Sequence, residues 1–322
     1  YANERPYQYT HLVTNPTMAG YQAHLDSLRR SRIILDDEDN LQNASLSIPP
    51  FTVYHPQPGG FSTGVQGTDF VRLGDAVNNL TGILHWSFSG VSGTEDWRLR
   101  PVSQYPATFV AENPRPTVPE KTRGNIAVSS YNVLNYFTTL RTQNSNARGA
   151  DSAAELMRQT QKLIAALKSI DPDAFGLIEM ENTGDTALIY LVNQLNADLG
   201  GPIYTYIPTG KIGTDAIKNG IIYKPSVLKP LGKPAILDSI DFATQNRPAV
   251  AQSFMVIDQN NPDFGAVFTL VVNHFKSKAS GSGPDGIDMG DGQGLSNGVR
   301  RKAAETLRNW LATDPTNCND PD

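Results

Sequence analysis

The chain has 322 residues and a mass of 35.0 kDa, a length that suggests about two domains. Hydrophobic residues make up 39% and charged residues 18% of the sequence, with glycine and proline scattered, which excludes collagen-like, coiled-coil and wholly disordered chains. The formal net charge is -5, so a polyanionic partner would need a local basic groove or bound cations. No apolar run approaches the roughly 20 residues that cross a bilayer, so no membrane span is expected.

The first residue suggests how the chain was processed, and the one cysteine limits the covalent cross-links that it can form. The first residue is Tyr1, and a chain that does not begin with Met is expected after removal of a leader. We therefore favour a secreted protein. Cys318 is the one cysteine, so no internal disulfide and no metal-thiolate cluster can form.

Residues 1–112 are expected to form a β-rich domain. Short segments rich in Ile, Val, Phe and Trp are separated by Gly, Pro, Asn and Asp turns. The predicted strands cover residues 31–35, 50–54, 70–73 and 82–88. The stretch AENPRPTVPEKTRG at 111–124 contains three prolines and several charges, and it predicts an interdomain linker over 113–124.

Residues 125–322 change to strands that alternate with helices. The predicted strands cover residues 126–131, 174–178, 220–223 and 268–272. Ser152 and Glu155 form a capping-box signature that begins the first helix. The apolar positions that mark three helices are Leu156, Leu163, Ile164 and Leu167, then Leu188, Leu191 and Leu195, then Ala303, Leu307, Trp310 and Leu311. Buried strands between helices predict a layered α/β or α+β domain.

Polar side chains concentrate at the ends of three of these predicted strands. Asn132 follows the first strand, Glu179 follows the second, and Asn273 and His274 follow the last. Because sites in layered sheets form at strand ends, we expect an amide, a carboxylate and an imidazole to converge there. The alternative is that each side chain caps backbone groups in a loop.

Such a combination suits the hydrolysis of phosphate esters. Glu179 would bind a hard divalent cation, Mg²⁺ or Ca²⁺, that neutralises developing phosphoryl charge, and Asn132 would help to fix the metal or the phosphate. His274 would donate a proton or a hydrogen bond to a phosphoryl oxygen. Arg247 and Lys276 are the local positive charges that an acidic protein needs for this substrate, and solvated surface is the alternative for the lysine.

A glycine-rich loop, GPDGIDMGDGQG, carries three aspartates at a spacing of three residues. Asp285, Asp288 and Asp291 offer oxygen ligands that suit Ca²⁺, although the spacing is not that of an EF-hand. A solvated acidic loop is the alternative, and we favour it slightly over a calcium site.

Six segments are specific enough to compare with a known family: VSSYNVLNYFTTL, RGADSAAELMRQTQKL, DAFGLIEMEN, GTDAIKNGIIYKP, NRPAVAQSF and VVNHFKSK, followed by GDGQG. They resemble the secreted bacterial nucleases of the ExeM/NucH type and cover most of residues 126–320 in consistent order. Those nucleases belong to the endonuclease/exonuclease/phosphatase superfamily, whose fold is the deoxyribonuclease I-like four-layered α/β sandwich. The earlier segments RSRIILDD, VRLGDAVNNLTGILHWSF and WRLRPV resemble the β-rich, OB-like region of the same group.

The resemblance therefore implies an α+β chain with an OB-like domain over 1–112, a linker over 113–124 and a nuclease domain over 125–322. It implies that Asn132, Glu179 and His274 are catalytic and that Glu179 and Asn132 are metal ligands. Arg247, Asn273 and Lys276 would contact the substrate.

The reaction that the resemblance implies is in-line attack of water on a phosphodiester, with Mg²⁺ or Mn²⁺ as cofactor and structural Ca²⁺ as a further expectation. DNA is the expected substrate, RNA is left open, and the expected location is outside the bacterial cell. The alternatives are a phosphomonoesterase or a phospholipid phosphodiesterase of the same superfamily, and a DNA-binding fragment without catalysis.

The sequence departs from the family pattern near its C-terminal end. In the family, the helix that contains Trp310 leads into a strand with a Gly-Asp-x-Asn motif, and a later Asp-His pair supplies a second histidine. Neither motif follows His274 here. We therefore expect a fragment of a longer protein, inactive or weak alone, with a sheet edge that a missing C-terminal segment or another chain covers.

Overall fold

The structure is a computed structural model that describes residues 17–36, 74–89, 93–102, 104–105, 108–110, 112, 118–120, 124–239, 242 and 245–319. The chain divides into two compact units, Tyr1–Pro116 with Met289–Gly294, and Thr117–Asp288 with Leu295–Asp322. The division after Pro116 falls inside the linker predicted over 113–124. The strands predicted over 50–54 and 70–73 lie outside the described residues.

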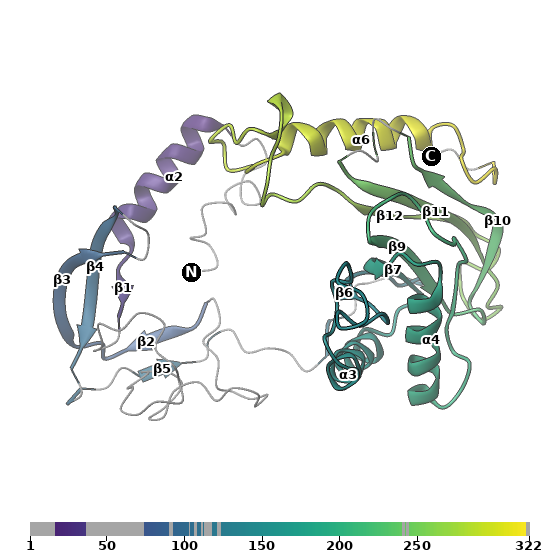
Figure 1. Cartoon of the computed structure of the whole chain (residues 1–322), viewed down its shortest axis with the longest axis horizontal. Coiled ribbons are helices and arrows are strands. Elements are labelled where there is room, and N and C mark those ends of the chain that lie inside the picture. Colours follow the sequence, from purple (N-terminus) through teal and green to yellow (C-terminus); the bar gives the residue numbers. More distant parts are fainter. Residues whose placement is uncertain are drawn as a thin grey trace. The chain divides into compact units, whose positions relative to one another are not determined.

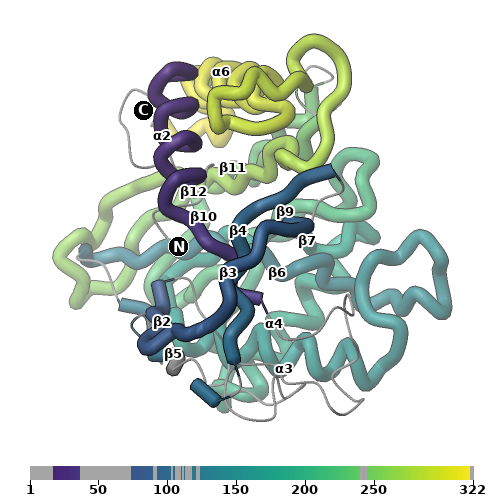
Figure 2. Tube along the Cα trace, turned by 90° about the vertical axis from the view of Figure 1, so that its left-hand side faces the viewer, coloured from purple at the N-terminus to yellow at the C-terminus, as the bar shows by residue number. Residues whose placement is uncertain are grey.

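The first unit combines one helix with two small sheets. Helix α2 (Met18–Ser31) begins after Thr17, whose hydroxyl accepts a hydrogen bond of 3.1 Å from the backbone N–H of Gly20. One sheet has the order β1 (Ile34–Leu35), β4 (Glu95–Pro101), β3 (Gly82–Phe88), and a second pairs β2 (Ala76–Asn78) with β5 (Thr108–Val110). Figure 2 shows α2 leading into β1 beside β4 and β3. The sequence prediction missed α2, and the strand predicted over 31–35 shortens to β1 because Ser31 still belongs to the helix.

Two tryptophans lie opposite each other on the β3–β4 pair. Trp86 and Trp97 are directly paired, and their rings meet edge to face with centroids 5.2 Å apart. The two residues remain 49% and 48% exposed, so neither ring is a core side chain of this unit. The OB-like assignment of the unit stays a prediction.

The second unit contains two separate sheets (Figure 1). The first has the order β6 (Val128–Tyr136), β7 (Ala174–Glu181), β9 (Ile217–Tyr223), β8 (Thr205–Tyr206), with β6 and β7 parallel and the other pairs antiparallel. The second is the antiparallel sheet β10 (Leu228–Leu237), β11 (Arg247–Val256), β12 (Val267–His274).

The two sheets pack face to face across an apolar core. Ile221 of the first sheet shares this core with Val250, Phe254 and Val272 of the second. The sheets approach closely at Gly176 in β7, because a Cβ atom there would lie only 2.8 Å from Cγ2 of Val272. A larger residue at position 176 would therefore push the sheets apart.

Helices cover the outer faces of the two sheets. Side chains alternate along β7, so Phe175 and Leu177 point away from the second sheet and pack with helices α3 (Ala153–Ile170) and α4 (Thr186–Leu199). Helix α6 (Asn297–Leu311) packs on the second sheet through Ala303, Leu307 and Trp310. Figure 1 shows α6 along β10–β12 and α3 and α4 beside the first sheet.

The prediction of mixed helices and strands is confirmed, and so are the three helices predicted for this unit. Ser152 accepts a hydrogen bond of 3.3 Å from the backbone N–H of Glu155, which is one half of a capping box, and the Glu155 carboxylate accepts the backbone N–H of Asp151 at 2.8 Å. Of the apolar positions predicted to share one face of α3, Leu163, Ile164 and Leu167 are buried. In the part of the chain that the structure describes, no helix is both long and apolar enough to cross a lipid bilayer.

Candidate active site

Irregularities in β6 and β7 position the amide and the carboxylate of the site. The pairing register shifts between Asn132 and Tyr136 in β6, where Asn135 has a left-handed φ of 49°. A matching shift in β7 contains Glu179, whose φ is 72°. The prediction that Asn132 and Glu179 follow their strands is therefore wrong. The two strands continue to Tyr136 and Glu181, because each bulge accommodates the unpaired residues and the strand pairing resumes after it.

The Glu179 carboxylate is oriented by two hydrogen bonds from β6. Nδ2 of Asn132 donates to Oε1 of Glu179 at 2.9 Å, and the backbone N–H of Asn135 donates to Oε2 at 3.0 Å. The other amide atom of Asn132, Oδ1, accepts the backbone N–H of Leu134 at 2.8 Å. Asn132 thus links the bulge of β6 to the carboxylate in β7.

The imidazole of the site comes from the second sheet. Asn273 and His274 are the last two residues of β12 rather than loop residues that follow it, because pairing with β11 extends to His274. Nε2 of His274 lies 3.8 Å from Oε1 of Glu179, and the two side chains are 18% and 16% exposed. The structure therefore brings Asn132, Glu179 and His274 together where the two sheets meet.

The environment of His274 favours its neutral form. Burial lowers the pKa of His274 below its ordinary value, and the positive charge of Arg247 lowers it further, while Glu179 and Asp215 act in the opposite direction. Nδ1 of His274 and Oδ1 of Asn273 are buried without a hydrogen-bond partner among the described residues. At neutral pH this imidazole has one N–H to donate and one nitrogen to accept a proton.

Two polar neighbours of the site hold loops in place. Glu181 accepts hydrogen bonds from the backbone N–H groups of Thr138 and Thr139, at 2.9 and 3.2 Å, and from the Thr138 hydroxyl at 2.9 Å. Asn182 donates to the backbone carbonyls of Ile212 and Asp215, at 2.6 and 2.8 Å. Glu181 therefore fixes the loop after β6, and Asn182 fixes the loop that presents Asp215.

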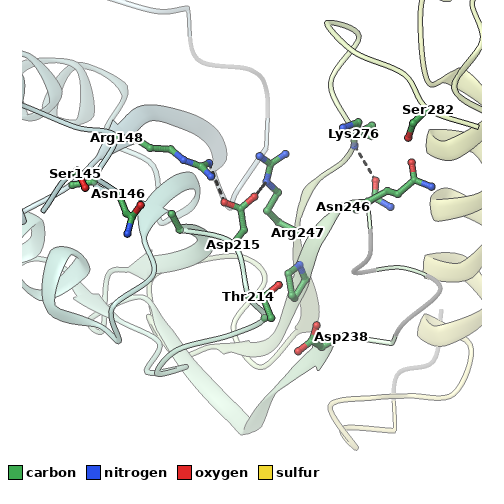
Figure 3. A pocket seen from close by; sticks show the side chains of 15 residues that line it. Ser145, Asn146, Arg148, Thr214, Asp215, Asp238, Asn246, Arg247, Lys276 and Ser282 are labelled. Atoms are coloured by element: carbon green, nitrogen blue, oxygen red, sulfur yellow. Dashed lines mark hydrogen bonds and ion pairs between the residues drawn. The ribbon is translucent and has the colours of Figure 1, made fainter. Parts of the chain in front are cut away.

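A cavity of about 1060 Å³ lies beside this site and contains an Arg–Asp–Arg arrangement (Figure 3). Nη1 of Arg148 lies 3.0 Å from Oδ1 of Asp215, and Nε of Arg247 lies 3.0 Å from Oδ2. The Arg247 contact is an ion pair in which the N–H is not aligned as a hydrogen bond. Arg247 is also the strand partner of His274, so the cavity and the Glu179 site share one wall.

The sequence prediction found part of this cavity and missed the rest. Arg247 and Lys276 line it as predicted substrate-side residues, and the backbone N–H of Lys276 donates to Oδ1 of Asn246 at 2.9 Å. Arg148 and Asp215 were missed, although both lie in the segments RGAD and GTDAIK that carry the family resemblance. Asn273 does not line the cavity.

The ligands around Glu179 suit a small hard cation. An ionised carboxylate offers about four acceptor positions, and Glu179 uses two of them for Asn132 and Asn135. Mg²⁺ in phosphoryl-transfer sites binds one or two carboxylates, completed by water and substrate phosphate rather than by a cage of protein ligands. The donor set therefore fits Mg²⁺ or Mn²⁺, with Asn132 orienting the carboxylate.

The three aspartates of the glycine-rich loop give no support to a calcium site. The carboxylate of Asp285 pairs with Lys302, and Oδ1 of Asp291 accepts the backbone N–H of Gln293 at 2.9 Å. Within the described ranges, no group of three or more His, Cys, Asp or Glu side chains is arranged to hold a metal ion.

Comparison with known proteins gives similarity at the level of structure. No protein-family model and no curated protein sequence matches the chain. An endonuclease/exonuclease/phosphatase family protein from Bacteroides thetaiotaomicron is 15% identical, with a TM-score of 0.37 over 60% of each chain. A mannosyl-6-phosphatase of the same organism is 14% identical, with a TM-score of 0.35 over 60% of this chain and 61% of the other. A humanised TDP2 from D. rerio is 16% identical, with a TM-score of 0.34 over 58% and 59%.

The chain thus spans about 60% of the length of these structural neighbours.

Proposed function

We propose that the second unit is the centre of a metal-dependent phosphodiesterase, a secreted bacterial nuclease that hydrolyses DNA. The observation that carries this proposal is the Glu179 carboxylate, oriented by Asn132 and Asn135 and 3.8 Å from the His274 imidazole. A carboxylate, an amide and a neutral imidazole beside a cavity with arginines match what hydrolysis of a negatively charged ester needs.

Each side chain has a separate task in the proposed reaction. Glu179 would hold a divalent cation, which would neutralise the charge that develops on the phosphoryl oxygens. Asn132 keeps the carboxylate in one orientation, and His274 in its neutral form donates a hydrogen bond to a phosphoryl oxygen. Arg247, which is paired with His274 across β11 and β12, places a permanent positive charge on the wall that this site shares with the cavity.

The residues of the site are compatible with more than one class of phosphate ester. The same groups would serve a phosphomonoesterase or a phospholipid phosphodiesterase, and RNA contains the same diester as DNA. Initial rates on plasmid DNA, RNA, a phosphomonoester and a phospholipid, measured with the same Mg²⁺ concentration, separate these activities. DNA binding without cleavage of any of them would favour the non-catalytic alternative.

The test of the proposal is plasmid cleavage combined with Mg²⁺ binding. We expect the wild-type chain to bind Mg²⁺ in calorimetry and to show weak plasmid cleavage that EDTA stops, because a fragment lacking the later family motifs is expected to be weak alone. Glu179→Gln removes the charge and should lower both Mg²⁺ affinity and cleavage by about 100-fold or more. Glu305→Gln, an exposed position on α6, is the matched control. Wild-type Mg²⁺ affinity or wild-type cleavage in Glu179→Gln would refute the assignment.

A further inference from the structure

The cavity beside the candidate active site is lined by three cationic side chains and two acidic ones. Arg148, Arg247 and Lys276 all line it, in a chain whose formal net charge is -5. The negative side chains in the lining are Asp215 and Asp238. In an acidic protein, such a local excess of cations is the feature expected where a polyanion is bound.

Asp215 forms ion pairs with two of these cations and still leaves them able to bind another anion. It holds Arg148 through Nη1 and Arg247 through Nε, and Figure 3 shows the two guanidinium groups on either side of its carboxylate. Arg247 reaches Asp215 with Nε, so its two terminal nitrogens stay available for a second anion. A guanidinium fork of this kind is suited to phosphate.

Lys276 adds a cation that is not engaged by a carboxylate. No acidic side chain among the residues described in the structure lies within ion-pair distance of its ammonium group. Its backbone is fixed through Asn246, which is itself buried and donates from Nδ2 to the carbonyl of Phe242 at 2.9 Å. The backbone of Lys276 is therefore fixed at the cavity wall, and its ammonium group has no carboxylate partner in the part of the chain that the structure describes.

We propose that this cavity binds a second, uncleaved phosphodiester of the same nucleic-acid strand, held by Arg148, Arg247 and Lys276. The proposal rests on the proposed function, because it takes the scissile phosphate to lie at Glu179 and His274. Arg247 faces His274 directly across the strand pair, so consecutive phosphates of one strand would reach the site and the cavity together. The volume, about 1060 Å³, slightly exceeds the roughly 300–1,000 Å³ of typical small-molecule sites.

With two phosphate sites, the chain should bind a nucleic-acid strand more tightly than it binds a small phosphate ester. A phosphomonoester or a single nucleotide would fill the Glu179 site and bring no phosphate to the cavity cations. A strand that occupies both gains additional charge-assisted hydrogen bonds. Asp215 is then a positioning residue, whose carboxylate keeps the two arginines in the orientation that the second phosphate needs.

Binding of a fluorescein-labelled 20-nucleotide DNA single strand, measured by anisotropy in EDTA over a series of salt concentrations, tests the proposal without requiring catalysis. Arg148→Gln and Lys276→Gln should each weaken binding by about three- to tenfold. Each should also lower the slope of log affinity against log salt by about 0.7, the value for one phosphate contact on a single strand. Arg308→Gln and Lys162→Gln, which remove exposed charges outside the cavity, are the matched controls and should keep the wild-type slope.

A second pair of variants distinguishes a positioning role of Asp215 from the effect of its negative charge alone. Asp215→Asn and Asp238→Asn each remove one negative charge from the cavity lining, so electrostatics alone predicts tighter DNA binding for both. Asp238 has no ion pair among the described residues, and its variant should bind more tightly. We expect Asp215→Asn to bind more weakly, because its arginines lose their orientation. Tighter binding by Asp215→Asn would refute the positioning role.

Thermal melting of every variant confirms that the fold is retained. Slopes and affinities of Arg148→Gln and Lys276→Gln equal to those of the two controls would overturn the cavity proposal. This failure differs from a failure of the proposed function, in which Glu179→Gln would leave Mg²⁺ binding or cleavage unchanged whatever the cavity variants do.

Discussion

Arg247 and His274 lie directly opposite each other across the β11–β12 pair. Opposed residues of antiparallel strands have Cβ atoms about 4.5–5.5 Å apart, so a permanent cation stands next to the imidazole. Burial of His274 and then this cation lower its pKa, and the Glu179 and Asp215 carboxylates offset part of the effect. The arginine proposed to contact the substrate therefore also lowers the pKa of the histidine beside it.

In the metal-free protein, removal of a positive neighbour and removal of a negative neighbour should shift the pKa of His274 in opposite directions. NMR titration in EDTA should give wild-type His274 a pKa below the ordinary value of 6.5. Arg247→Gln removes a positive charge and should raise that pKa, so the protonated form persists to higher pH. Asp215→Asn removes a negative charge and should lower it. A His274 pKa that is the same in all three proteins would contradict this electrostatic account.

Asn132→Ala should weaken metal binding without removing the metal-binding carboxylate. Glu179 would keep the hydrogen bond from Asn135 and lose the one from Nδ2 of Asn132. Residues that orient a metal ligand typically change affinity or activity by about 10–100-fold. We expect a rise of that size in the Mg²⁺ dissociation constant measured by calorimetry. An unchanged constant would show that the carboxylate does not depend on Asn132.

The contact between the sheets at Gly176 should be sensitive to a single methyl group. Gly176→Ala places a Cβ atom 2.8 Å from Cγ2 of Val272, and overpacking of this kind costs about 1–3 kcal/mol of unfolding free energy. Val272→Ala removes the clashing atoms, so the double variant should be more stable than additivity of the two single changes predicts. Denaturant unfolding of the four proteins measures the coupling, and a strictly additive result would argue against direct contact.

The ion pair of the half-buried Asp185 with the buried Lys218 should make stability depend on pH. Nζ of Lys218 is fully buried and lies 2.5 Å from Oδ1 of Asp185, so Lys218→Met, which leaves Asp185 without its cation, should cost about 3 kcal/mol or more. Burial alone would raise the pKa of Asp185, but hydrogen bonds from Lys218 and from the backbone of Gly210 hold it below its usual 3.8.

Because the folded-state pKa of Asp185 is below the unfolded value, its contribution is present above about pH 4 and is lost as the pH falls further. Urea unfolding of the wild type should therefore show declining stability below that pH. Asp185→Asn removes the titrating group, and its stability should decline less steeply over the same range. Equal slopes for the two proteins would assign the acid sensitivity to other carboxylates.

Periodicity and strand-end reasoning predicted the parts of the molecule that depend on local pattern. The apolar spacing of α3 and the N-cap at Ser152 follow from local chemistry, and both are confirmed. The strand-end pattern also selected Asn132, Glu179 and His274, which the structure brings together. Polar side chains near the ends of apolar strand segments therefore carry enough information to indicate where two sheets bring polar groups together.

The remaining features depend on contacts that no local pattern encodes. The positive φ of Glu179 belongs to a residue that is not glycine, so nothing in the sequence indicates the bulge. Asp215 gains its role from two arginines that are distant along the chain, and from Asn182, which fixes its loop. Helix α2 was missed because the short apolar segments around it suggested a β-rich region.

The groups proposed to react are divided between two sheets, since Glu179 belongs to β7 and His274 to β12. Neither sheet alone holds the pair, so the candidate site exists only after the sheets have docked. Contacts between such distant chain segments form late in folding, because closing long loops is slow. Hydrolysis regained during refolding would therefore time the docking of the sheets, and it should lag behind the return of helical circular dichroism.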